Sequence, residues 1–80
     1  MFTLDKIVWT EDETGWYDEK RFPIGIFETQ QEAFDSALCH ASFEADEETW
    51  NWSDFNQALT WYEEDSMGCA HGIRFQIRSL

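Results

Sequence analysis

The stretch from Phe22 to Ala41, FPIGIFETQQEAFDSALCHA, constrains the fold most, because it joins an expected strand directly to an expected helix. Every second residue from Phe22 to Ile26 is apolar, a pattern typical of a strand. Thr29 and Glu32 then form a capping-box pattern, in which the threonine oxygen accepts a hydrogen bond from a free N–H at the start of a helix. A strand that leads straight into a helix predicts a small α+β domain.

The expected helix carries one apolar stripe. Residues at positions i, i+3, i+4, i+7 and i+11 are apolar, as in a helix that packs one side on a core. They are Phe34, Ala37, Leu38, Ala41 and Ala45. We expect this stripe to face the sheet.

Three segments are expected to be strands. Residues 2–9 and 22–27 flank an acidic turn (10–21) and predict an antiparallel hairpin. The apolar alternation of the first strand changes parity at Asp5 and Lys6, which predicts a bulge or an edge twist there. Ile73 to Leu80 alternates apolar and polar residues and predicts the final strand.

The segment 49–65 has two interpretations. Trp52, Phe55, Leu59 and Tyr62 have helical spacing and Ser53 could cap them, which predicts a second short helix. The alternative is a strand over residues 59–63 that pairs with the last strand. The predicted fold is therefore one α+β domain over residues 1–80. Its mainly antiparallel sheet has three strands, or four, and one or two helices cover one face.

Composition restricts the function. The 80 residues include five Trp, seven Phe and two Tyr, enough aromatic area for a core without metal or disulfide support. Seventeen acids against five bases give a net charge of −12, which argues against direct binding of nucleic acid or an anionic membrane. No apolar run could span a bilayer and no secretion signal precedes the domain, so we expect a cytoplasmic protein, as a monomer or weak dimer.

No catalytic or metal-binding motif is present. Cys39, His40, Cys69 and His71 are zinc-ligand types, but their spacing does not match structural zinc sites, and two cysteines cannot form a disulfide framework. We expect Cys39 to be a small buried residue. The carboxylate pairs have no nearby nucleophile signature. The sequence therefore predicts a protein that is not an enzyme and needs no cofactor.

Acidic runs and two tryptophans are the candidate partner-binding residues. Acidic runs are usually solvated loops, but here they gather a large charge of one sign. Trp50 and Trp52 lie beside one run, and tryptophan is enriched among interface hot spots. The acidic candidates are Glu11, Asp12, Glu13, Glu44, Asp46, Glu47, Glu48, Glu63, Glu64 and Asp65.

In size and charge, the chain resembles the small acidic inhibitors of phages and mobile elements that mimic DNA, among them anti-CRISPR and anti-restriction proteins. The runs EDE (11–13), EADEE (44–48) and EED (63–65) carry this resemblance. It implies an inhibitor that binds the basic, nucleic-acid-binding surface of a host defence complex in the cytoplasm of the host cell. The basic bias of the last strand departs from a uniformly acidic mimic.

A second hypothesis belongs to another class. A small protein–protein adaptor, or an antitoxin-like binder, would use an aromatic patch, with the acids serving solubility. Salt separates the two hypotheses, because binding through charge weakens as ionic strength rises and an aromatic interface is nearly indifferent.

Overall fold

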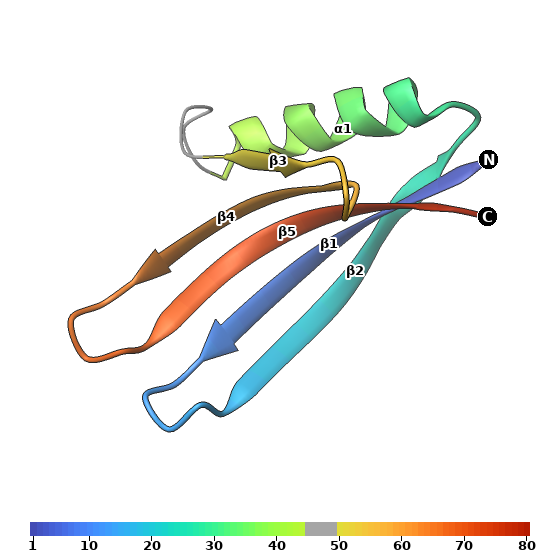
Figure 1. The fold of residues 1–80 in the computed structure, drawn as a ribbon. Coiled ribbons are helices and arrows are strands. Elements are labelled where there is room, and N and C mark those ends of the chain that lie inside the picture. The colour runs from blue at the N-terminus through green and yellow to red at the C-terminus, as the bar shows by residue number, and fades with distance from the viewer. Residues whose placement is uncertain (45–49) are drawn as a thin grey trace.

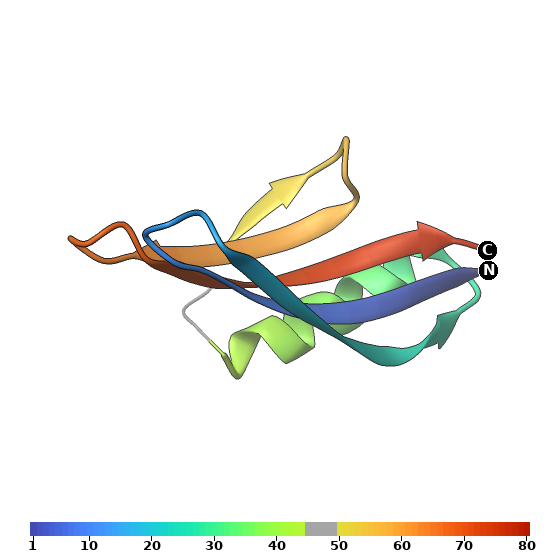
Figure 2. The same ribbon diagram turned by 90° about the horizontal axis from the view of Figure 1, so that it is seen from below.

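A computed structural model describes residues 1–44 and 50–80, which form one five-stranded antiparallel sheet with one helix (Figure 1). The elements are β1 (Phe2–Glu11), β2 (Tyr17–Phe27), α1 (Gln30–Ser42), β3 (Asn51–Ser53), β4 (Ala58–Glu64) and β5 (Ala70–Ser79). The strand order is β2-β1-β5-β4-β3. The helix lies across one face of the sheet and leaves the other face open (Figure 2).

This architecture corrects the predicted one of three or four strands with one or two helices. The second predicted helix is wrong: its residues form the hairpin β3–β4, and β4 pairs with β5, as in the alternative interpretation. Ser53 Oγ does accept a bond from the N–H of Asn56, as a helix cap would, but Gln57 then turns the chain with φ of 52°. Phe55 is 96% exposed in this turn, so the helical spacing of apolar residues did not mark a buried stripe.

The predicted hairpin of β1 and β2 is confirmed, with a turn over residues 12–16 that is shorter than expected. The register shifts between Leu4 and Asp5, which leaves Ile24 of β2 without an opposite residue. The bulge therefore lies on the edge strand, while β1 pairs with β5 without a break. Leu4 and Ile7 consequently lie on opposite faces of the sheet, and both are fully buried.

The structure confirms the capped helix and shows which of its residues pack on the sheet. Thr29 is the N-cap, and its Oγ1 accepts a hydrogen bond from the N–H of Glu32 at 3.2 Å. The buried line of α1 consists of Ala33, Ala37 and Ala41, whereas Phe34 and Leu38 are half-buried beside it. Short alanine side chains let the helix approach the sheet closely. Predicted stripe residue Ala45 lies outside the described residues.

The core lies between α1 and the covered face of the sheet. Its fully buried larger side chains include Phe75 of β5 and Leu4 of β1, and Ile77 packs with them. The chain termini lie side by side at one end of the sheet, joined by a bond from the N–H of Leu80 to the carbonyl of Met1. The turns 12–16 and 65–69 lie at the opposite end, which we call the distal end (Figure 1).

Within residues 1–44 and 50–80, the single helix is too short and too polar to cross a bilayer.

Candidate functional site

The two turns of the distal end are built in the same way. Each has the pattern Asp-x-x-Gly-x, with Asp12 and Gly15 in one and Asp65 and Gly68 in the other. Both glycines adopt positive φ, 87° and 89°, a conformation that strongly favours glycine. The two turns therefore share the same local sequence pattern and the same glycine conformation.

In each turn the aspartate carboxylate accepts hydrogen bonds from two backbone N–H groups. Asp12 Oδ1 accepts bonds from the N–H groups of Thr14 and Trp16 at 2.9 and 3.0 Å. Asp65 Oδ1 accepts from the N–H groups of Met67 and Cys69 at 2.8 and 3.0 Å. Two of the predicted partner-binding acids thus shape the turns. The repeated pattern was visible in the sequence and was missed.

The pKa of Asp12 is lowered from its ordinary value of 3.8. The hydrogen bond from the Thr14 hydroxyl, 2.6 Å long, is the largest cause, and the backbone N–H groups of Trp16 and Thr14 act in the same direction. All of these donors stabilise the ionised carboxylate. Asp12 therefore stays negatively charged in mildly acidic solution.

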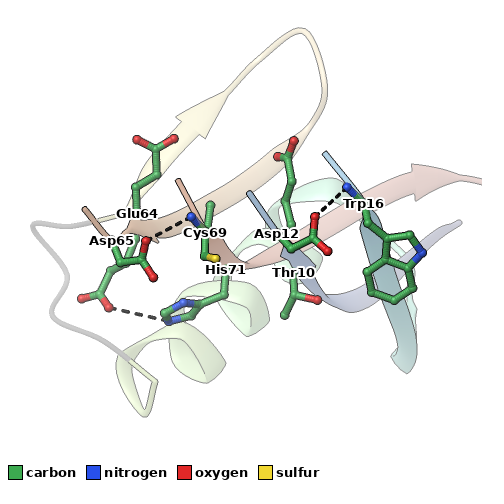
Figure 3. Close-up of a pocket in the computed structure, with 10 residues that line it drawn as sticks. Thr10, Asp12, Trp16, Glu64, Asp65, Cys69 and His71 are labelled. Atoms are coloured by element: carbon green, nitrogen blue, oxygen red, sulfur yellow. Dashed lines mark hydrogen bonds and ion pairs between the residues drawn. The ribbon is translucent and has the colours of Figure 1, made fainter. Parts of the chain in front are cut away.

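The turns flank an open pocket of about 450 Å³, and five of the predicted acids line it: Glu11, Asp12, Glu63, Glu64 and Asp65 (Figure 3). The strand register explains its shape. Ala70 of β5 lies opposite Glu11 of β1 on one side and Glu64 of β4 on the other. Because neighbouring strands are about 4.8 Å apart, the Cα atoms of the two glutamates are roughly 10 Å apart, with the small Ala70 between them.

The acids of this end are largely uncompensated. Within the described part of the chain, Glu11, Glu13 and Glu64 have no ion pair or hydrogen bond through their carboxylates. Glu63 approaches His71 Nε2 at 3.6 Å, with both side chains exposed. By contrast, within residues 1–44 and 50–80, four of the five basic residues pair with acids away from this end. The distal end therefore carries a concentrated negative charge.

The remaining predicted residues do not join this end. Glu44 follows α1 and forms an ion pair with Lys6. Trp50 and Trp52 are half-buried: Trp50 lies near Phe75, and Trp52 meets Phe34 edge-on with ring centroids 4.9 Å apart. Both indoles therefore pack at the edge of the hydrophobic core. Asp46, Glu47 and Glu48 lie outside the described residues.

The open face carries an aromatic row that the sequence interpretation missed. Trp9 of β1 lies between Tyr17 and Tyr62, with ring centroids at 6.0 and 6.3 Å. Beneath it is Gly72, where a Cβ atom would lie 2.7 Å from the indole of Trp9. The two tyrosines are 47% and 57% exposed. Only the pairing of strands brings the three rings together.

All three arginines also lie on the open face, each held by an acid. Arg21 and Arg78 both contact Oδ2 of the buried Asp5, at 2.7 and 3.0 Å. Arg74 lies 3.6 Å from Glu19. The basic bias of the final strand is thus neutralised locally and forms no free basic surface.

No group of three or more metal-ligating side chains occurs among residues 1–44 and 50–80. Cys39 and Cys69 are free thiols. The prediction that Cys39 is buried is wrong, because it lies on the exposed side of α1, away from the alanine line.

Comparison of the chain with protein-family models, with curated proteins and with solved structures finds no match.

Proposed function

We propose that this protein is a non-enzymatic inhibitor that binds the basic, nucleic-acid-binding surface of another protein complex and excludes nucleic acid from it. The observation that carries the proposal is the convergence of residues 11–13 and 63–65 at the distal end of one sheet. These runs are 50 residues apart in sequence but adjacent in space. Convergence of this kind turns scattered acids into one negatively charged surface.

The spacing of the two glutamates suits DNA mimicry. Glu11 and Glu64 project from the same side of β1 and β4, on either side of Ala70. Their Cα atoms are roughly 10 Å apart, a distance between the widths of the minor and major grooves of B-DNA, about 6 and 12 Å. A basic surface that spans phosphates across a groove could therefore contact both carboxylates at once.

The strands and turns hold this charge in place. The carboxylates of Asp12 and Asp65 accept hydrogen bonds from backbone N–H groups of their own turns, and these bonds fix the turns. The neighbouring acids therefore project from a rigid backbone, which lowers the entropic cost of binding. A concentrated negative end also steers a basic partner during encounter, so association should be fast and strongly salt-dependent.

The test is displacement of a labelled DNA duplex from purified CRISPR effectors and restriction complexes, followed by fluorescence anisotropy at several salt concentrations. We expect displacement that weakens steeply as salt rises. The double substitution Glu11→Lys with Glu64→Lys should abolish it. The matched control is Glu28→Lys with Asp35→Lys, which makes the same change in net charge at exposed positions away from the distal end. Equal displacement by both double variants would refute the proposal.

The aromatic row supports a second candidate function, a protein–protein adaptor. Its site would be Tyr17, Trp9 and Tyr62, and not the half-buried Trp50 and Trp52. Binding by such an adaptor would survive high salt and the charge reversals of the distal end.

A further inference from the structure

The aromatic row and the glutamates of the distal end are neighbours on one face. Glu11 and Trp9 are two residues apart on β1, and so are Glu64 and Tyr62 on β4, so each pair projects from the same side. Residues two apart on a strand are separated by about 7 Å. Tyr17 lies directly opposite Glu11 in the register. The open face therefore presents aromatic rings beside carboxylates across three strands.

We propose that this surface binds arginine side chains of an extended segment of the basic partner, an inference that rests on the proposed function. A guanidinium group can stack on an aromatic ring and, at the same time, form paired hydrogen bonds with a carboxylate. Tyr17 and Tyr62 offer exposed rings, and Glu11 and Glu64 offer carboxylates without an internal partner among the described residues. Both halves of an arginine-recognition site are thus present.

The row has a stable base. Gly72 has no room for a side chain, since a Cβ would lie 2.5 Å from the carbonyl oxygen of Trp61 and 2.7 Å from the Trp9 ring. Trp9 therefore packs flat on the sheet and supports the tyrosines on either side. Such a support restricts the rings before binding, which reduces the entropy lost on contact.

Charge on the face selects the partner and its orientation. Toward the distal end the row is bordered by free glutamates, and toward the other end by Arg21 and Arg74. An arginine of the partner is attracted to the first border, whereas at the second border Asp5 and Glu19 are already paired with arginines of the sheet. The same acidic border, in a chain with a net charge of −12, disfavours single-stranded nucleic acid, which would otherwise suit a sheet with exposed rings.

Two peptides of equal length and charge provide the probe, one alternating arginine with glycine and the other lysine with glycine, four basic residues in each. Each is titrated into the isotopically labelled protein while the amide of Gly72 and the indole N–H of Trp9 are followed by NMR. We expect the arginine peptide to shift both signals and to bind more tightly than the lysine peptide, because the planar guanidinium stacks and the ammonium does not.

Substitution of one exposed ring isolates the stacking contribution. Tyr62→Leu should weaken the arginine peptide roughly two- to fivefold, the value of one exposed cation–π contact. Tyr62→Phe, which retains the ring, should restore binding. Phe55→Leu is the control, since Phe55 is an exposed aromatic residue in the turn that precedes β4, at the end of this strand opposite to Glu64.

Four results would overturn the inference. These are equal binding of both peptides with no effect of Tyr62→Leu, no binding of either peptide, a shift of the Trp9 signal by an oligothymidine, and a shift on raising the protein concentration alone. The last two would assign the face to nucleic acid or to a second copy of the chain. Each of these four results can be obtained while the protein still displaces duplex DNA. The proposed function is therefore tested separately, by the charge-reversal variants.

Discussion

Gly72 offers the sharpest test of the packing on the open face. An alanine Cβ at this position would lie 2.5 Å from the carbonyl oxygen of Trp61 and 2.7 Å from two ring atoms of Trp9. Real Cβ contacts are longer than 3.0 Å, so either the backbone of β4 or the indole has to move. Gly72 is also buried, which leaves no free space for the displaced atoms.

The expected cost of Gly72→Ala follows from overpacking. Extra methyl groups in well-packed sites destabilise by about 1–3 kcal/mol. A domain of this size has a free energy of unfolding of roughly 4–12 kcal/mol, so the variant should still fold. Each kcal/mol lowers Tm by roughly 4–8 °C in a domain of this length.

Gly25→Ala is the matched control. Its Cβ would meet only the ring of Phe27, at 3.7 Å, an ordinary contact, and its φ lies outside the left-handed region. Alanine there restricts the unfolded chain, so we expect no loss and a gain of up to about 1 kcal/mol. Thermal unfolding by circular dichroism of both variants provides the comparison. Equal Tm values for the two variants would refute the close contact between Trp9 and β5.

Three further predictions concern the core, the turns and metal. Phe75→Ala should cost about 3–5 kcal/mol because the ring is fully buried, whereas Leu38→Ala should cost clearly less because Leu38 is half-buried; chemical denaturation measures both. The lowered pKa of Asp12 means that its ionised form stabilises the fold above the ordinary value of 3.8 and that this contribution is lost as pH falls through the lower folded pKa. Asp12→Asn should therefore be less stable than the parent at pH 7, with a difference that shrinks toward pH 2; a constant difference would contradict this account. A chelator should leave Tm unchanged, and a clear fall would reveal a metal site.

Patterns that depend on a few neighbouring residues were predictable. The cap at Thr29 uses an N–H three residues away, so the sequence alone placed the start of α1. The strand β5 and the hairpin of β1 and β2 could also be predicted, because in a sheet with one covered face apolar and polar residues alternate along each strand. The two turns could have been recognised too, because Asp-x-x-Gly-x satisfies its own backbone groups.

Residues 50–64 show where local reasoning failed. Trp52, Phe55 and Leu59 have helical spacing, yet Phe55 is exposed and the segment forms β3 and β4. β4 completes its hydrogen bonds with β5, where the paired residues lie 6 to 18 positions further along the chain. Short apolar runs have no strong preference of their own, so a partner strand outside the segment decides their structure.

The features of the candidate site also fall into two groups, those that the sequence determined and those that the tertiary structure decided. The sequence by itself determined the large negative charge, its separation into runs and the absence of a recognisable catalytic motif. Only the tertiary structure decided that residues 11–13 and 63–65 meet at one end, that Asp12 and Asp65 build turns, and that Trp9 lies between Tyr17 and Tyr62. The physical reason is strand register: β5 lies between β1 and β4, and this pairing of distant segments determines which side chains become neighbours.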